Sequence, residues 1–152
     1  MENLYVVKME KEMIDRCAAL FMDTFSKEPW NDAYDSVEQV VRFFNGHLAN
    51  NYFAGYVAML QNQMIALCLG MKKPWVKGME YYIDEFCVRS DLQGTGIGSR
   101  FLKEIEKDIR EQGMDGMILN TQNGFPSRKF YEKNGFHEIQ GLSVFARRVA
   151  DH

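Results

Sequence analysis

The chain has 152 residues, of which 46% are hydrophobic and 26% charged, and its formal net charge is −3. This length suits one domain with a sizeable core. A net charge this small excludes the basic surface with which proteins bind nucleic acids or anionic membranes. Apolar runs stay short of the roughly 20 residues that span a bilayer, and the first residues lack the basic and apolar regions of a signal peptide. We therefore expect one cytoplasmic domain over residues 1–152, with neither nucleic acid nor membrane as a partner.

The first third of the chain predicts one strand and two helices. A short strand over residues 4–9 is followed by apolar residues at helical spacing over residues 13–25 and again over 37–48. The polar residues between the two helices include Asp35 and Ser36, and either is a candidate N-cap for the second helix.

Strand-like runs dominate the middle of the chain. Residues 52–60 and 64–71 are joined by Gln61-Asn62-Gln63, which indicates a hairpin, and a third run covers residues 79–88. A helix with one apolar face then ends near Gly113. The remaining predicted elements are a strand over residues 117–120, a helix over 127–133, and strands over 136–139 and 143–148. The order β-α-α-β-β-β-α-β-α-β-β predicts an α/β fold with one mixed sheet.

The three cysteines, Cys17, Cys68 and Cys87, are odd in number, widely spaced and set in apolar runs. Such spacing favours neither a disulfide framework nor a metal site. We predict that all three are small core residues and that the protein holds no metal.

A glycine-rich turn, Gln93-Gly94-Thr95-Gly96-Ile97-Gly98, lies between the third strand-like run and the following helix. Glycines let the backbone approach an anion, and the amides at the helix start then point at that anion. Ser99 stands where a dinucleotide fingerprint needs its third glycine, and no Lys-Ser/Thr pair follows Gly98 as a Walker A loop requires. The turn therefore predicts a pyrophosphate cradle, with a ligand-free strand-to-helix turn as the alternative.

Two segments resemble motifs of the GNAT superfamily of N-acetyltransferases. Residues 83–98, Ile-Asp-Glu-Phe-Cys-Val-Arg-Ser-Asp-Leu-Gln-Gly-Thr-Gly-Ile-Gly, resemble its strand, pyrophosphate loop and helix start. Residues 127–136, Ser-Arg-Lys-Phe-Tyr-Glu-Lys-Asn-Gly-Phe, resemble its A-x-x-F-Y-E-K-x-G-F helix and turn. The resemblance covers nearly the whole chain and implies a single mixed, mostly antiparallel central sheet flanked by helices. The resemblance also leads us to expect that the protein forms a homodimer.

The resemblance implies acetyl-CoA as co-substrate, with its pantetheine arm along the strand that ends at Val88 and its pyrophosphate on the amides of the glycine-rich turn. Gly124 stands where many members carry an asparagine, and Asn123 beside it is the candidate for that contact. The expected cofactor-binding residues are Phe86, Cys87, Val88, Gln93, Gly94, Thr95, Gly96, Ile97, Gly98, Ser99, Asn123 and Ser127.

The activity implied is transfer of the acetyl group to a primary amine by direct attack on the thioester. Asp84 and Glu85 are the candidate proton acceptors, and strand alternation predicts them on opposite faces, Asp84 with Phe86 and Glu85 with Cys87. Aminoglycoside 6'-N-acetyltransferases carry an active-site aspartate at the place of Asp84, in a similar Ile-Asp-Gln setting. We expect Asp84 to be the general base or the carboxylate that binds a cationic acceptor, with two solvated edge carboxylates as the alternative.

Tyr131 matches the motif tyrosine that sits near the CoA sulfur in many family members. A phenol is a competent proton donor to a thiolate at neutral pH, so Tyr131 is the candidate acid, with packing in the short helix as its alternative role. His47 and His137 belong to no motif, and we expect both to be surface or structural residues.

The acceptor is expected to contact the loop between the first two helices and the last hairpin. Aromatic and acidic side chains in that loop suit a small cationic amine such as an amino sugar or polyamine, although they are also common in solvated turns. The candidate acceptor-binding residues are Trp30, Tyr34, Tyr82 and Glu85. Two alternatives remain: a protein or peptide amine as acceptor, and a non-catalytic module that senses acyl-CoA.

Overall fold

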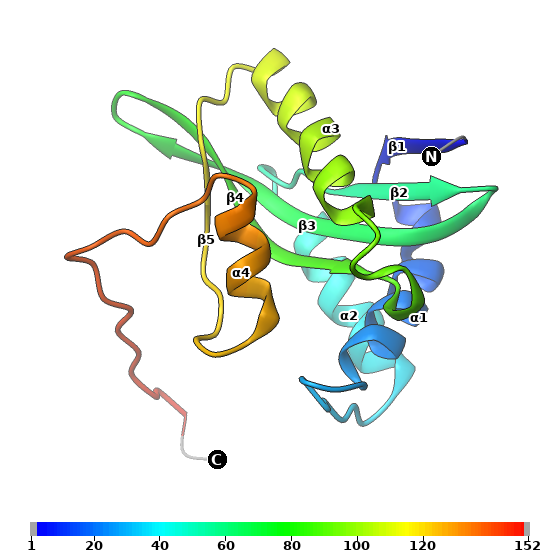
Figure 1. The fold of residues 1–152 in the computed structure, drawn as a ribbon. Helices are drawn as coiled ribbons and strands as arrows, with labels where there is room; N and C mark the ends of the chain where they lie inside the picture. The colour runs from blue at the N-terminus through cyan, green and yellow to red at the C-terminus, as the bar shows by residue number, and fades with distance from the viewer. Residues whose placement is uncertain (1–2, 151–152) are drawn as a thin grey trace. The chain divides into compact units, whose positions relative to one another are not determined.

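The structure is a computed structural model that describes residues 3–150 and divides the chain after Asn120 into two compact units (Figure 1). The first unit holds one five-stranded sheet with the strand order β1-β2-β3-β4-β5. Its strands are β1 (Leu4–Lys8), β2 (Tyr56–Leu60), β3 (Gln63–Trp75), β4 (Gly78–Val88) and β5 (Met117–Leu119). Strands β1 to β4 are antiparallel, and β5 runs parallel to β4. This confirms the mixed, mostly antiparallel sheet.

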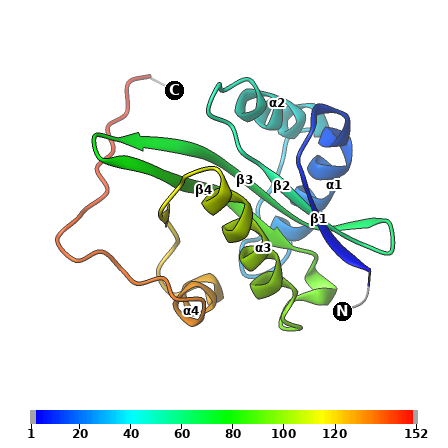
Figure 2. The same cartoon turned by 90° about the horizontal axis from the view of Figure 1, so that it is seen from above.

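Helices cover both faces of the sheet (Figure 2). On one face lie α1 (Ile14–Phe25), which follows a 3-10 turn η1 (Lys11–Met13), and α2 (Val37–Leu48); on the other lies α3 (Ile97–Glu111). Apolar side chains of α1 and α2 pack against β2, β3 and β4, and this core includes Cys17, Phe21, Val40, Phe44, Val57, Leu67, Leu69 and Cys87. All three cysteines are buried and free, as predicted.

Local sequence explains the ends of several elements. The Ser36 hydroxyl accepts a hydrogen bond from the Gln39 amide at 3.1 Å and so caps α2. Gln61 and Asn62 both adopt positive φ between β2 and β3, which gives a tight two-residue hairpin loop rather than the three-residue loop predicted. Strand β2 begins at Tyr56 rather than at residue 52, and β3 continues to Trp75.

The second unit contains α4 (Pro126–Lys133). Proline at its first position suits a helix start, and Gly135, at φ 90°, ends it as the predicted Asn134-Gly135 stop requires. The predicted strands over residues 136–139 and 143–148 are wrong, because no strand follows β5 in the residues that the structure describes. Alternating apolar residues alone do not make a strand, which also needs a hydrogen-bonded neighbour.

Within residues 3–150, no helix is long and apolar enough to cross a membrane. The same residues contain no cluster of three or more His, Cys, Asp or Glu side chains that is arranged to hold a metal ion.

Candidate functional site

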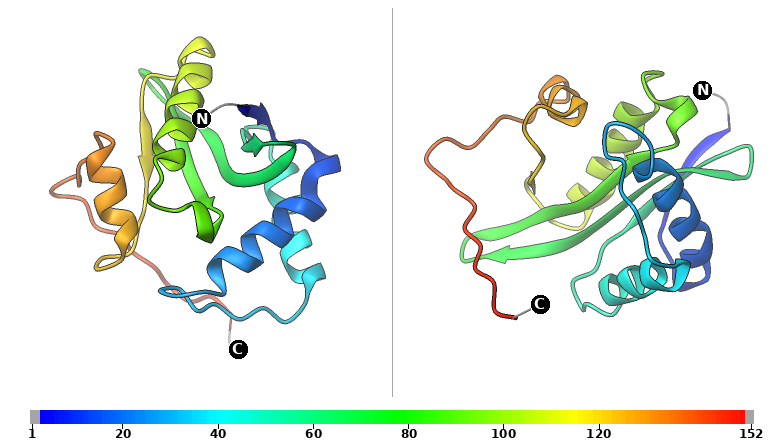
Figure 3. Two further views of the ribbon diagram at one scale, coloured as in Figure 1. Left: turned by 45° about the vertical axis from the view of Figure 1, so that its right-hand side comes forward. Right: turned by 90° about the horizontal axis from the view of Figure 1, so that it is seen from below.

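The C-terminal half of β4 has a free edge. Strand β5 pairs with β4 only from Tyr81 to Ile83, so residues 84–88 pair with β3 alone among the described strands (Figure 3). The Arg89 amide donates to the Ile65 carbonyl at 2.7 Å, and hydrogen-bonded pairs alternate along an antiparallel ladder. The main-chain groups of Phe86 and Val88 therefore point away from β3, toward the free edge.

The Val88 carbonyl on this side accepts a hydrogen bond from Gln93 Nε2, so the Val88 amide and the Phe86 main chain are the groups predicted to pair with the pantetheine arm. Cys87 differs from them, because its main chain pairs with Leu67 of β3 and its side chain is buried in the core beside α1. Neither its main chain nor its side chain therefore faces the edge of β4 beside Phe86 and Val88, and the cofactor contact of Cys87 stays a prediction.

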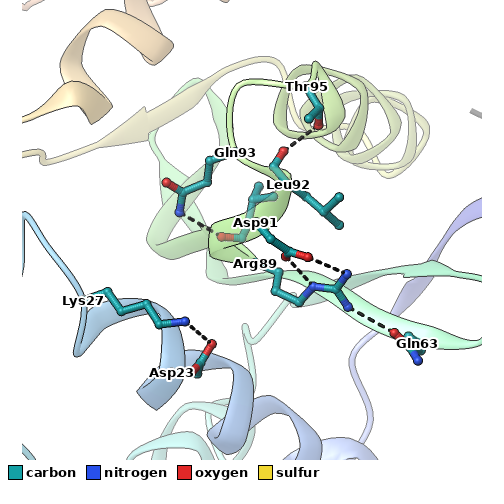
Figure 4. Close-up of polar contacts among 9 residues, drawn as sticks. Asp23, Lys27, Gln63, Arg89, Asp91, Leu92, Gln93 and Thr95 are labelled. Carbon is teal, nitrogen blue, oxygen red and sulfur yellow. Dashed lines mark hydrogen bonds and ion pairs between the residues drawn. The ribbon is translucent and has the colours of Figure 1, made fainter.

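The glycine-rich turn follows β4 through a 3-10 turn, η2 (Ser90–Leu92), and leads into α3. Gly94 and Gly96 have φ values of 79° and 90°, a left-handed conformation that residues with a Cβ rarely adopt. Gln93 Nε2 donates to the Val88 carbonyl at 3.0 Å, and the Thr95 hydroxyl donates to the Leu92 carbonyl (Figure 4). These two bonds fix the turn against the end of β4.

The backbone amides of residues 94–99 have no hydrogen-bond acceptor within the part of the chain that the structure describes. They lie at or just before the N-terminus of α3, a helix of 15 residues, where the helix dipole favours negative charge. A run of free amides with two left-handed glycines is the arrangement that cradles a phosphate, so these residues fit the pyrophosphate of acetyl-CoA.

A β-bulge in β4 changes the predicted positions of the two carboxylates. Glu85 lies opposite Leu69 and Ile83 opposite Gly70, so Asp84 is an extra residue without a partner on β3. Glu85 lies on the α1/α2 face with Cys87, as predicted, but the bulge shifts the alternation before it, so that Tyr82 shares this face and Asp84 contacts α2 on the same side. The prediction that Asp84 and Glu85 face opposite sides is therefore wrong, because strict alternation does not survive the extra residue.

Asp84 contacts a residue that sequence reasoning missed. His47 Nε2 of α2 lies 3.1 Å from Asp84 Oδ2, on the same side of the sheet as Glu85. His47 also packs edge-on to Phe43, with ring centroids 4.8 Å apart. The sequence did hold a signal for it: His47 falls three residues after the buried Phe44 and seven after Val40, on the stripe of α2 that faces the sheet.

The Glu85 carboxyl sits in an acidic and partly buried environment. Burial, with the negative charges of Asp84 and Asp32, raises its pKa to about 7. Burial, with Asp32 and Glu85, likewise raises the pKa of Tyr34 to about 12, and the Tyr34 hydroxyl oxygen is buried without a hydrogen-bond partner among the described residues. Asp32, Tyr34, Asp84 and Glu85 thus form an acidic cluster beside the free edge of β4.

Three of the four predicted acceptor-binding residues belong to the α1/α2 face, namely Tyr34, Tyr82 and Glu85. The Tyr82 hydroxyl accepts a hydrogen bond from Asn120 Nδ2 at 2.9 Å. Trp30 packs edge-on to Phe25 at the end of α1, with ring centroids 5.0 Å apart.

The other predicted site residues lie in the second unit. Tyr131 of α4 packs edge-on to Phe130 and Phe136, with ring centroids 5.2 and 5.4 Å away. Asn123 Oδ1 accepts a hydrogen bond from Arg128 Nη1 at 3.2 Å. The Ser127 hydroxyl lies 2.7 Å from that of Thr121. The aromatic contacts hold the Tyr131 side chain on one side of α4.

Comparison with known proteins adds a family and a fold. Residues 14–136 match the model of the acetyltransferase (GNAT) family. A possible acetyltransferase from Clostridium difficile 630 superposes with a TM-score of 0.82 at 15% identity, over 99% of this chain and 100% of the other. An aminoglycoside acetyltransferase from an uncultured soil metagenomic sample, solved with sisomicin, gives 0.76 at 16% identity over 97% of each chain. The aminoglycoside acetyltransferase AAC(6')-Iy, solved with a CoA-containing bisubstrate analogue, gives 0.74 at 15% identity over 96% and 99%.

Proposed function

Because the chain belongs to the acetyltransferase (GNAT) family, we propose that it transfers the acetyl group of acetyl-CoA to a primary amine. One observation carries the proposal: β4 extends beyond its pairing with β5 and runs directly into a glycine-rich turn whose amides lack acceptors among the described residues. These are the two contacts that a pantetheine arm and its pyrophosphate need. We also propose that residues 1–152 act as one domain, since the family match spans both compact units.

Acetyl-CoA supplies the acetyl group as an activated thioester. In the proposed reaction the amine nitrogen forms a bond to the acetyl carbon as the bond from that carbon to sulfur breaks. The amine proton passes to a carboxylate, for which Asp84 is the proposed acceptor, and the leaving thiolate takes a proton from Tyr131. Asp84 has a second candidate role, binding a cationic acceptor, which its position in the acidic cluster also supports.

We propose a small cationic acceptor, such as an amino sugar or a polyamine. The acidic cluster and the nearby aromatic rings of Trp30 and Tyr82 attract ammonium groups. Two relatives of the same fold were solved with an aminoglycoside or with an aminoglycoside-derived analogue, which supports the same class. A peptide amine is the competing acceptor, and an acyl-CoA sensor without turnover is the competing function.

Mass spectrometry of the products separates these candidates. The protein is incubated with acetyl-CoA and, in separate reactions, with aminoglycosides, polyamines, amino acids and short peptides. We expect acetylated products from one class of small polyamine or amino sugar. Products from peptides alone would replace the proposed acceptor class, and CoA binding without any product would favour the sensor.

A further inference from the structure

Asp84 is the carboxylate at the bulge of β4, and its side chain has one ion-pair contact within the described part of the chain, with His47. The 3.1 Å separation of His47 Nε2 and Asp84 Oδ2 is within hydrogen-bonding range. Of the two atoms only Nε2 can donate a hydrogen, because a carboxylate is an acceptor. The contact is made at Oδ2, and no hydrogen bond to Oδ1 is found within residues 3–150.

The imidazole is itself held in place. His47 lies in the last turn of α2, and the same helix is anchored in the core by Val40 and Phe44. The ring of Phe43 packs edge-on against the imidazole, which limits its rotation. The His47 side chain is only 23% exposed, whereas that of Asp84 is 43% exposed. A partly buried imidazole held by Phe43 therefore contacts a carboxylate that solvent and ligands can reach.

The surroundings of Asp84 make this contact important. A bulge residue lacks a partner on the neighbouring strand, so the β3 ladder does not fix its side chain. Its other charged neighbour is Glu85 on β4, which in turn faces Asp32 and Tyr34 of the loop between α1 and α2. No lysine or arginine within residues 3–150 forms an ion pair with Asp84 or Glu85, so His47 is the one basic side chain in contact with this carboxylate among the described residues.

We propose that His47 is a positioning residue for Asp84, holding that carboxylate at the β4 bulge in the orientation that acetyl transfer to an amine requires. This inference rests on the proposed function. It adds a residue of α2 to a site otherwise built from β4 and the glycine-rich turn, and it assigns His47 a role through Asp84 rather than direct contact with substrate.

Two substitutions of His47 separate positioning from packing. His47→Leu removes the donor, and we expect kcat to fall by between about tenfold and a hundredfold with the KM for acetyl-CoA unchanged. His47→Gln keeps an amide N–H of similar reach, and we expect it to recover most of the lost kcat. Asn45→Leu is the matched control, because it places leucine at an exposed position of the same helix. Equal losses in the Leu and Gln variants would overturn the inference.

A double-mutant cycle with Asp84→Ala gives the sharper test, since a residue that acts through Asp84 has nothing to position once that carboxylate is removed. We expect His47→Leu to leave the residual turnover of the Asp84→Ala protein unchanged. The same fold-change in kcat in both backgrounds would show that His47 acts independently and would overturn the inference.

A parallel double-mutant cycle that measures the free energy of unfolding in urea must also show coupling between the two residues. Additive effects in that cycle would mean that the pair does not form. A wild-type protein that acetylates no amine would instead overturn the proposed function, and with it any catalytic purpose of the pair.

Discussion

Gln93 Nε2 donates to the carbonyl oxygen of Val88 at 3.0 Å, so the first residue of the glycine-rich turn is bonded to the last residue of β4. The bond turns the Val88 carbonyl toward the turn and joins the two parts of the proposed acetyl-CoA site. It also explains why a long polar side chain is useful at position 93. The geometry of the glycine-rich turn and that of the end of β4 therefore depend on each other.

Gly96→Asp tests the phosphate cradle. Aspartate brings a Cβ to a residue at φ 90° and a negative charge to the start of α3, so we expect the affinity for acetyl-CoA to fall at least tenfold. Gly113→Asp is the matched control, since Gly113 has φ 87°, equally open surroundings and a place at the other end of α3. Calorimetric titration should show weak binding for the first variant only. Similar affinities in both variants would remove the turn from the site.

Asp84→Asn tests the proposed proton acceptor. The amide keeps the shape of the side chain but accepts no proton, so we expect kcat to fall by on the order of a hundredfold with the affinity for acetyl-CoA retained. Asp115→Asn, at an exposed position, serves as the control. A large rise in the KM of the acceptor with little change in kcat would instead assign Asp84 to acceptor binding.

Glu85→Gln tests the acidic cluster through stability. The folded protein raises the pKa of Glu85 from 4.5 to about 7, so it binds this proton more tightly than the unfolded chain. The stability that Glu85 contributes is therefore fully present below about pH 4.5 and is lost as the pH rises through about 7. We expect the variant to gain stability over wild type between pH 5 and 8, by on the order of 3 kcal/mol.

Urea unfolding at several pH values measures this gain, with Glu104→Gln on the exposed face of α3 as the control. A difference between variant and wild type that stays constant with pH would contradict the raised pKa.

Tyr131→Phe tests the proposed donor to the thiolate. The ring and its contacts with Phe130 and Phe136 remain, so we expect the variant to fold and its kcat to be at least tenfold lower. Tyr52→Phe makes the same chemical change at a tyrosine that is 45% exposed. Wild-type kcat in the Tyr131 variant would limit this residue to packing.

Local rules account for what the sequence predicted correctly. The left-handed glycines of the turn, the Ser36 cap of α2 and the Asn134-Gly135 stop of α4 each depend on a few neighbouring residues. The five strands and the helices on either side of them follow from the period of their apolar residues. These features place the glycine-rich turn at the start of α3 without any knowledge of the tertiary structure.

Non-local pairing explains what the sequence could not predict. The bulge at Asp84 exists only in the register between β3 and β4, and it brings Asp84 to the side of the sheet opposite the predicted one, next to Glu85. The contact between His47 and Asp84 joins residues of different elements, and no spacing rule relates them. The apolar alternation over residues 143–148 predicted a strand that the structure does not contain among its described residues. Alternation misleads here because it carries no information about a pairing partner.

The central claim is that the protein uses acetyl-CoA to acetylate an amine, and amine-dependent release of free thiol from acetyl-CoA tests it most directly. We predict release that saturates with an aminoglycoside or polyamine, falls to background without the amine, and is lost in the Gly96→Asp protein. Thiol release at the same slow rate with and without every amine, from a protein shown to bind CoA, would contradict the claim.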